Sequence, residues 1–386
     1  MPLVDRALSQ TIEAFADVLD RLLGGDPEST PPPVMTFWCG AGFSKAWDRH
    51  APTDGELFVL QADELEDFPN LRQLLKAIGW GDHDHINFEG FKTLGYIIDM
   101  QIRHPEIRNR HVDAHNLKLS VNEIRTLIQR RFRAACEMAT VDPETLRFPV
   151  RDDPDKRAIL SFFDRLATSA SRMGRAVPTP LFHFVTTNYD FTIETILDHI
   201  GGGPSVFGRL YRGVTPSRIC GRTIWDHLPL TVDRNLIKVN GGFEILRSGD
   251  TYHFDYRDRR DEAVREEPPL LILPSRAQDY GDPYFHEIFP KAVRLLRETD
   301  VLVIVGYSMP REDALLRFIL RQLAENPEDA RGKHVFLIDT KPPDVIRERL
   351  EKVFFSIDRI GWPRTHYYPG RFEDFCRAAA GAGEYC

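Results

Sequence analysis

The stretch VMTFWCGAGFS, residues 34–44, places a short apolar run directly before a turn that contains two glycines. Near-continuous Val, Ile, Leu and Phe over five or six residues is typical of parallel strands that are covered on both faces. Helical patterns follow several such runs, as in FTIETILDHI at 191–200. This order predicts an α/β fold with a doubly wound parallel sheet. The four further runs are PLFHFVTT (180–187), LIKVN (236–240), VLVIVG (301–306) and VFLID (335–339).

Residues 45–180 differ from the rest because they are charged, contain several helical patterns and offer few convincing strands. We interpret them as a mostly helical insertion between the first and second strands of the sheet. A chain of 386 residues exceeds what one core normally supports, which agrees with a large insertion. The predicted organisation is a first part of the α/β domain at 1–44, the insertion at 45–180, and the remainder of the α/β domain at 181–386.

The overall composition argues against several classes of protein. A net charge of −8 disfavours a general nucleic-acid-coating role, so we predict no direct binding of nucleic acid. The five cysteines include no C-x-x-C pair, which disfavours a zinc ribbon or another metal site and fits reduced thiols in a cytosol. No stretch approaches the length of a membrane span, and the N-terminal segment has helical periodicity unlike a signal peptide. We expect a cytoplasmic protein.

Polar residues follow the second predicted strand at the point where it ends, in TTNYD at 186–190. Such residues are costly on a buried strand unless they are hydrogen-bonded or face a cavity. Asp190 could simply cap the following helix, but capping does not explain Asn188. Because open α/β sheets bind ligands outside the carboxyl ends of their strands, this strand end is a candidate site.

The other strand ends offer weaker signals of the same kind. The glycines after Cys39 could let the backbone approach a phosphate, or they could form a plain tight turn. Ser308 stands just before a helical pattern, and the Asp339 carboxylate could accept hydrogen bonds from ribose hydroxyls. The run LIKVN ends on Asn240 and two glycines, which alone is a common turn signal. Only the joint pattern indicates a ligand site.

These motifs, in this order, resemble the sirtuin-like (Sir2-like) NAD-binding family, and most closely the bacterial Sir2-like NAD hydrolases of antiviral defence. The resemblance rests on GAGFS (40–44), TTNYD, KVNGG (238–242), VGYS (305–308) and the LID strand. It implies a Rossmann-like domain that binds NAD as a substrate. By matching position, the resemblance places Gly40, Ala41, Gly42 and Ser44 at the pyrophosphate. It places Asn188 and Asp190 at the nicotinamide ribose and nicotinamide pocket, with Thr187 in the same NAD site. It places Gly306 and Ser308 at the phosphate and ribose, and Asp339 at the adenosine ribose.

Two departures from the family pattern affect the expected chemistry. Deacylating sirtuins carry a four-cysteine zinc site, which this sequence cannot build, and the strand end that usually bears a His bears Asn240 instead. An amide cannot act as a general base near neutral pH. NAD hydrolysis, unlike deacylation, does not require a general base. Asn188 could position the attacking water while Asp190 orients or stabilises the site. A displaced base at His183 or His227 stays open, and an engineered replacement of His would give the same sequence.

The sequence therefore supports two functions of different classes. The first is an NAD hydrolase effector of antiphage defence that releases nicotinamide and ADP-ribose, with Asn188, Asp190 and Asn240 as its catalytic residues. The second is a catalytically degenerate module that binds NAD or ADP-ribose and regulates or scaffolds a partner. A protein deacylase ranks below both. The resemblance also suggests a homo-oligomer and a defence partner, such as a HerA-like ATPase or an Argonaute-like protein.

Overall fold

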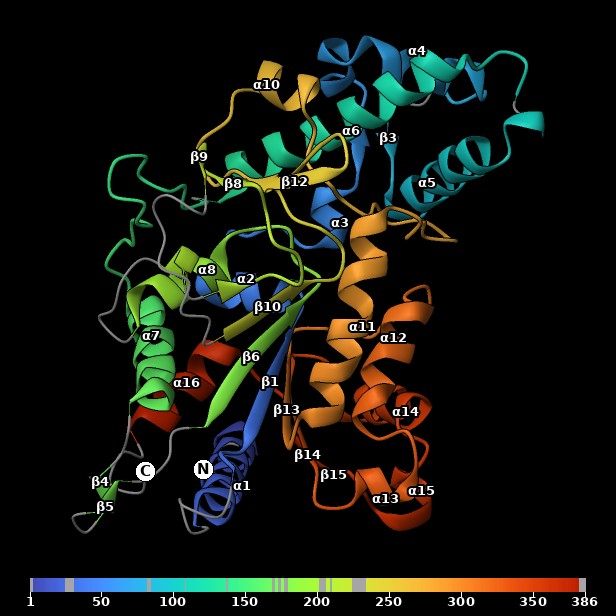
Figure 1. The fold of residues 1–386 in the computed structure, drawn as a ribbon. Coiled ribbons are helices and arrows are strands. Elements are labelled where there is room, and N and C mark those ends of the chain that lie inside the picture. Colours follow the sequence, from blue (N-terminus) through green and yellow to red (C-terminus); the bar gives the residue numbers. More distant parts are fainter. Residues whose placement is uncertain are drawn as a thin grey trace.

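The centre of the protein is one sheet of seven strands in which all neighbours run parallel (Figure 1). The computed structural model describes residues 3–24, 31–81, 85–107, 109–136, 138–168, 171–172, 175–176, 180–200, 206–208, 210–223 and 234–381. In spatial order the strands are β15 (Arg364–Tyr368), β14 (His334–Ile338), β13 (Val301–Val305), β1 (Val34–Cys39), β6 (Leu181–Thr186), β10 (Arg234–Lys238) and β7 (Leu210–Tyr211).

The register of the sheet aligns the carboxyl ends of its central strands. Cys39, the last residue of β1, pairs with Val305 on one side and with Thr186 on the other. Val305 pairs in turn with Ile338, and Thr186 pairs with Lys238. The chain leaves β1 towards β6 and later returns to the other side of β1 as β13, so the strand order reverses between β1 and β13. Ligands of open α/β sheets bind at such a switch point.

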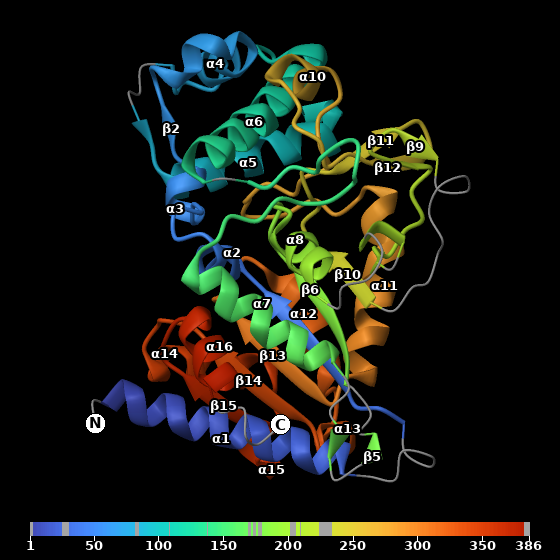
Figure 2. The same ribbon diagram turned by 90° about the vertical axis from the view of Figure 1, so that its left-hand side faces the viewer.

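Helices cover both faces of the sheet, as the near-continuous apolar strands require. On one face lie α7 (Pro154–Ala167) and α16 (Phe372–Gly381); on the other lie α11 (Pro283–Glu298), α12 (Ala314–Leu320) and α14 (Pro343–Val353) (Figures 1 and 2). Every residue of β13 is buried. Phe37 of β1 packs against Phe163 of α7, with ring centroids 5.0 Å apart. The predicted doubly wound parallel sheet, a Rossmann-like fold, is therefore confirmed.

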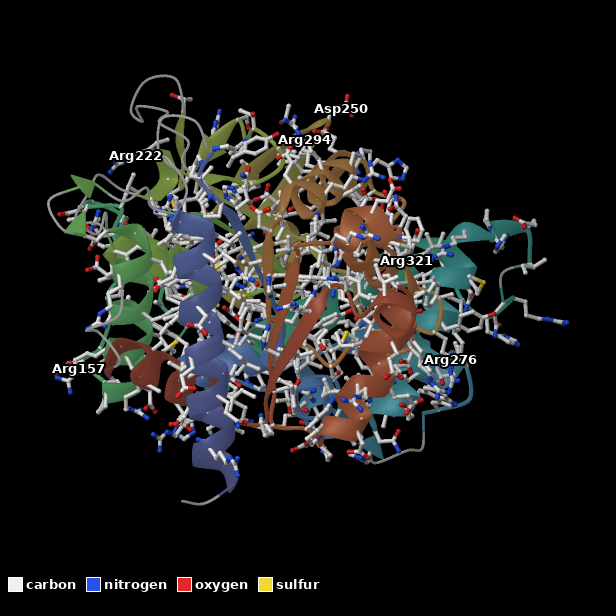
Figure 3. The ribbon with its side chains drawn as sticks, turned by 90° about the horizontal axis from the view of Figure 1, so that it is seen from below. Arg157, Arg222, Asp250, Arg276, Arg294 and Arg321 are labelled. Carbon is white, nitrogen blue, oxygen red and sulfur yellow. The ribbon has the colours of Figure 1, made fainter. Side chains whose placement is uncertain are left out.

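The N-terminal helix α1 (Leu3–Leu23) runs across the underside of the sheet, where Figure 3 shows it as the blue ribbon. Its Phe15 makes edge-on ring contacts with Phe336 of β14 and Phe375 of α16. Arg157 lies at the periphery of this view (Figure 3). Within the described ranges, no helix is both long and apolar enough to cross a membrane.

A second region, mainly helical, lies above the carboxyl edge of the sheet in Figure 1. It comprises α3 (Asp54–Leu57), α4 (Pro69–Ala77), α5 (Phe88–Arg103), α6 (Ala114–Ala135) and α10 (Asp261–Glu266), with the small sheet β11 (Ile245–Ser248), β12 (Thr251–Phe254), β8 (Arg218–Ile219) and β9 (Arg222–Thr223). The remaining short elements are α2 (Ala41–Trp47), α8 (Thr192–His199), α13 (Pro327–Ala330), α15 (Ile357–Ile360), β2 (Leu60–Gln61), β3 (His85–Ile86), β4 (Ser171–Arg172), β5 (Arg175–Ala176), η1 (Glu64–Asp67), η2 (Pro105–Ile107), η3 (Val206–Gly208) and η4 (Arg321–Leu323).

The expected insertion at 45–180 is mostly helical, but its helices occupy two places. Helices α3 to α6 lie above the carboxyl edge, whereas α7 lies beside the sheet (Figures 1 and 2). Phe162 of α7 contacts Phe372 and Phe375 of α16, so α7 shares the core of the sheet. The three-part division at 1–44, 45–180 and 181–386 stays a proposal, and this packing favours a boundary before α7.

Candidate active site

A cavity of about 570 Å³ lies at the carboxyl edge of the sheet. One wall is formed by strand ends and the turns that follow them, and the other includes apolar side chains of the helical region. Among the residues that the sequence predicted for the site, all but Gly40 line this cavity. They are Ala41, Gly42, Ser44, Thr187, Asn188, Asp190, Asn240, Gly306, Ser308 and Asp339. Five strand ends that are far apart in the sequence therefore meet around one space.

A chain of hydrogen bonds organises the end of β6. The Ser44 hydroxyl donates to Oδ2 of Asp190 over 2.5 Å, and the Asn188 Nδ2 group donates to the Ser44 Oγ over 2.8 Å. The same Nδ2 group also donates to the backbone oxygen of Gly40, again over 2.8 Å. Asp190 is buried, and its Oδ1 accepts from the backbone N–H of Thr192, the first residue of α8. Asp190 therefore satisfies the first N–H of α8 and also anchors Ser44.

This network fixes the orientation of the Asn188 amide. The carboxylate of Asp190 and the carbonyl of Gly40 can only accept hydrogen bonds, so the Ser44 proton points to Asp190 and the Asn188 NH₂ group points to Ser44 and Gly40. The amide oxygen Oδ1 then faces away from them and has no hydrogen-bond partner among the described residues. Because Asn188 lines the cavity, it presents an acceptor to whatever binds there.

The glycines of the two central strand ends serve close packing between the turns. A Cβ atom on Gly42 would lie 2.6 Å from the Gly306 Cα, and one on Gly40 would lie 2.5 Å from the Gly306 oxygen. Gly306 itself has φ of +57°, which disfavours a side chain there. The N–H of Gly42 donates to the Gly306 oxygen over 3.1 Å, and that of Phe43 donates to the Gly40 oxygen over 2.9 Å. Both N–H groups are therefore already hydrogen-bonded within the protein. The hypothesis that this turn binds a phosphate through its backbone would require them to be free.

Cationic side chains next to this turn offer another source of positive charge. Lys45 of α2 and Arg49 just after α2 both line the cavity. Lys45 lies 3.4 Å from Glu56, and Arg49 lies 3.4 Å from Asp155. Both pairs are partly exposed, and exposed ion pairs contribute little stability. An anionic ligand could therefore compete for either cation at a low cost.

The end of β10 also reaches the cavity. Asn240 is 9% exposed and lines the cavity, and its Oδ1 accepts from the Tyr280 hydroxyl over 3.3 Å. Gly241 has φ of +80°, and a Cβ there would lie 1.9 Å from the Leu270 oxygen. A Cβ on Gly242 would lie 2.3 Å from the Glu244 carboxylate. Protein atoms therefore fill the space on the Cβ side of both glycines.

A buried lysine joins the ends of β6 and β10. Lys238 donates from Nζ to the backbone oxygen of Asp190 over 2.6 Å and to Oε2 of Glu244 over 2.9 Å. Burial, together with the nearby charge of Glu194, raises the pKa of Glu244 to about 7 although Lys238 opposes that rise. The lysine thereby fixes the relative positions of the strand ends that carry Asn188 and Asn240.

The end of β14 presents a carboxylate. Asp339 is 8% exposed, lines the cavity and accepts at Oδ1 from the backbone N–H of Lys341 over 2.9 Å. Its Oδ2 accepts no hydrogen bond from the described residues. The backbone oxygen of Ser308 accepts from Arg349, while its side chain borders the cavity. Asp339 can therefore accept hydrogen bonds from a polyhydroxyl ligand, as the sequence suggested.

His183, one of the two histidines considered as a displaced base, does not line the cavity. His183 lies within β6, three residues before the strand ends, and its Nδ1 accepts from the backbone N–H of Asn235 over 3.2 Å. Burial and the charge of Arg234 lower its pKa to about 4. His227 lies outside the described residues. Among the residues that are described, no cluster of three or more His, Cys, Asp or Glu side chains could hold a metal ion.

The sequence reasoning missed the wall that the helical region contributes. This wall includes Leu57, Phe58, Phe88 and Phe132. It also missed Gln278, which lines the cavity from the segment before α11, and Tyr280 behind it. No periodic pattern marks these residues, because they enter the site from loops and helix ends. Of the residues missed, only Lys45 and Arg49 lie so close to GAGFS in the sequence that they could have been considered as part of the site.

This chain is similar to one family model over part of its length and, at low similarity, to several solved structures. Residues 183–357 match the family model of the SIR2-like domain. No curated protein matches the sequence. Solved structures with low similarity include a Sir2 enzyme studied for its mechanism and regulation, with 11% identity, a TM-score of 0.41, and coverage of 97% of this chain and 98% of that chain. A Sir2 protein bound to a propionylated peptide has 10% identity, a TM-score of 0.41, and coverage of 97% and 99%. A complex of Sir2 with a p53 peptide and NAD⁺ gives the same four values. The part of the chain that matches the SIR2-like domain, residues 183–357, includes the ends of β6, β10, β13 and β14.

Proposed function

We propose that this protein is an NAD hydrolase that cleaves the bond between nicotinamide and ribose and releases nicotinamide and ADP-ribose. The observation that carries the proposal is the Asn188 amide, whose oxygen is fixed as an acceptor at a strand end of a Sir2-like cavity. An oriented acceptor of this kind can hold a water molecule by one of its protons. Positioning alone can supply a large part of a catalytic effect.

The chemistry requires only that water replaces nicotinamide at C1′ of the ribose. As the C1′–N bond breaks, its electron pair goes to the pyridinium nitrogen, and nicotinamide leaves as a neutral molecule. The water oxygen bonds to C1′, and its surplus proton passes to bulk water. Asn188 would orient the water, and the Asp190–Ser44 pair would hold Asn188 in place. No protein group has to accept the proton.

The rest of the cavity suits the remainder of NAD. Its volume of about 570 Å³ lies within the range of typical ligand pockets, which is roughly 300–1,000 Å³. Asp339 would accept from the adenosine ribose hydroxyls, and Ser308 would lie near a ribose or phosphate. Ala41, Ser44 and Thr187 would line the diphosphate region. There Lys45 and Arg49 would supply the positive charge that the paired backbone N–H groups of Gly42 and Phe43 do not.

A second candidate function is a module that binds NAD or ADP-ribose without turning it over. Asn240 favours it, because the usual His of the family is replaced by an amide that cannot accept a proton at neutral pH. The two candidates share the binding site and differ only in catalysis. Asn188 and Asp190, both in place at the end of β6, favour the hydrolase.

We further propose that the hydrolase acts in the cytoplasm as an antiphage effector. A free and active NAD hydrolase would deplete its host, so the isolated chain is expected to be an oligomer with low activity. Activation would come from a defence partner, such as a HerA-like ATPase or an Argonaute-like protein. These elements rest on the resemblance of the motifs. Light scattering that shows a monomer at micromolar concentration, together with full activity, would contradict them.

The direct experiment incubates the purified full chain with NAD and separates nicotinamide, ADP-ribose and NAD by chromatography. Equal amounts of nicotinamide and ADP-ribose, above a heat-inactivated control, support the hydrolase. Binding of ADP-ribose by calorimetry without any turnover supports the regulatory module instead. A protein that neither cleaves NAD nor binds ADP-ribose contradicts both candidates.

A further inference from the structure

Tyr280 places its hydroxyl beside Asn240, at the strand end where the base of the family would stand. Its ring is held by edge-on contacts with Phe285 and Phe289 of α11, with centroid distances of 5.4 and 5.1 Å. The single proton of the hydroxyl is shared, in a three-centre hydrogen bond, between Oε1 of Gln278 at 3.0 Å and Oδ1 of Asn240 at 3.3 Å. Two amide oxygens therefore converge on one phenol.

The amide of Gln278 is oriented from its other end. Its Nε2 group donates to Oδ1 of Asp313 over 3.4 Å, and the buried Tyr307 hydroxyl donates to Oδ2 of the same carboxylate over 2.9 Å. A carboxylate only accepts hydrogen bonds, so the NH₂ group of Gln278 faces Asp313 and its oxygen faces Tyr280. The phenol must consequently act as a donor towards Gln278.

The same three-centre hydrogen bond has Oδ1 of Asn240 on the side of the phenol. With Oδ1 turned towards Tyr280, the Nδ2 group points away from it and donates to no described residue. Asn240 also lines the cavity, so an N–H donor is presented there. Asn188 presents an acceptor to the same space. A hydroxyl group, which both donates and accepts, is the ligand group that can satisfy an amide oxygen and an amide N–H together.

We propose that Tyr280 is a positioning residue that holds the Asn240 amide with its NH₂ group towards a ribose hydroxyl of NAD. This inference rests on the proposed NAD site. Asn240 then binds the hydroxyl oxygen and leaves its proton in place, so the ribose hydroxyl is not converted into a nucleophile. Water, held by Asn188, forms the new bond to C1′ as the bond to nicotinamide breaks, and its proton leaves to solvent.

Tyr280 itself does not replace the missing base. Burial, and after it the negative charge of Asp313, raise the pKa of its phenol, so the hydroxyl keeps its proton at neutral pH. A protonated phenol next to an amide is a fixed donor, which agrees with a positioning role. The arrangement thus favours hydrolysis over acyl-group chemistry that would need a deprotonated ribose hydroxyl.

A double-mutant cycle tests whether Tyr280 acts through Asn240. The variants are Tyr280→Phe, Asn240→Ala and the pair, and the readout is the dissociation constant of ADP-ribose by calorimetry with the full chain. Tyr280→Phe should weaken binding by about 5-fold in the parent, since residues in one hydrogen-bond network are coupled. In the Asn240→Ala background the same change should weaken binding by less than about 2-fold. Tyr211→Phe is the matched control, because among the described residues its hydroxyl bonds only to the backbone oxygen of Gly213, next to β7 at the edge of the sheet.

The possible outcomes separate this inference from the proposed function. A parent that binds ADP-ribose and loses the same factor in both backgrounds overturns the role of Tyr280 while the NAD site stands. A parent that binds neither ADP-ribose nor NAD overturns the site and the inference together. Where turnover is measurable, Tyr280→Phe should lower kcat for nicotinamide release and leave the melting temperature of the protein within the range of Tyr211→Phe.

Discussion

The ends of β6 and β10 carry the same functional group in opposite orientations. At the end of β6, the Asn188 NH₂ group donates hydrogen bonds to the protein, and its oxygen faces the cavity as an acceptor. At the end of β10, the Asn240 oxygen accepts a hydrogen bond from Tyr280, and its NH₂ group faces the cavity as a donor. The difference arises from the neighbours: a serine anchored by a carboxylate in one case and a phenol in the other. Two identical side chains thereby provide one acceptor and one donor.

The largest expected effect concerns the acceptor. Asn188→Ala should lower kcat for nicotinamide release by at least about 100-fold, as removing one preorganised polar group from an active site commonly does. The change removes the oxygen that holds the water. Asn116→Ala, in α6 and outside the cavity, is the control, and both variants should keep the circular dichroism of the parent. Turnover at the parent rate would reduce Asn188 to a structural residue.

Asp339, at a third strand end, extends the comparison because its side chain should contribute to NAD binding and not to catalysis. Asp339→Ala removes a carboxylate that would accept from both adenosine ribose hydroxyls, where each charge-assisted hydrogen bond is worth about 1.5–3 kcal/mol. The dissociation constant for NAD should rise by about 30-fold, with little change in kcat at saturation. Calorimetry with an unchanged dissociation constant would remove Asp339 from the site.

The orientation of Asn188 can be disturbed without touching Asn188. Asp190→Asn keeps the oxygen that accepts from the Thr192 N–H but places an NH₂ group opposite the Ser44 hydroxyl. Ser44 then loses its acceptor, and its proton competes with the Asn188 NH₂ group. We expect kcat to fall by about 10-fold, the effect of one hydrogen bond of roughly 1.4 kcal/mol. Equal activity of Asp190→Asn and the parent would mean that the network does not orient the amide.

The fold was predictable from the sequence to the extent that strands are buried on both faces. The run at 34–39 matches β1, the runs at 180–187 and 301–306 contain β6 and β13, and the runs at 236–240 and 335–339 overlap β10 and β14. The edge strand β15 was missed because its residues RTHYY are partly exposed and lack a continuous apolar run. The strand β7 was missed because it has only two residues. Buried parallel strands can be recognised by their continuous apolar runs. Edge strands form because of tertiary pairing, which the local sequence does not show.

Most of the strand-end residues that line the cavity could be predicted from the sequence, but the orientation of their amides could not. The strand-end motifs supplied Asn188, Asn240 and Asp339 because parallel strands bring their carboxyl ends together. The orientation of each amide depends on partners distant in sequence: Ser44 is 144 positions from Asn188, and Tyr280 is 40 positions from Asn240. Periodicity and spacing contain no information on such contacts. The packing role of Gly241 was hidden for the same reason, since Leu270 approaches it from another segment.

The smallest expected effect comes from converting the donor at the end of β10 into a base. In Asn240→His, the imidazole would occupy the cavity side, because Leu270 and Glu244 fill the space beside Gly241 and Gly242. The Tyr280 hydroxyl can still donate to Gln278 while its oxygen accepts from one ring N–H. The other ring nitrogen then faces the ligand without a proton and can accept one.

This variant should show a dependence on pH that the parent lacks. A histidine with a pKa near 6.5 is neutral, and so able to accept a proton, only above that pH. Nicotinamide release by Asn240→His should therefore rise by about 3-fold between pH 5.5 and 8.5, with its midpoint near 6.5, while the parent stays flat. Adding Tyr280→Phe should abolish the rise, because the ring would lose the partner that selects its tautomer. Superimposable flat profiles for the parent and Asn240→His would show that this strand end holds the substrate without taking part in proton transfer.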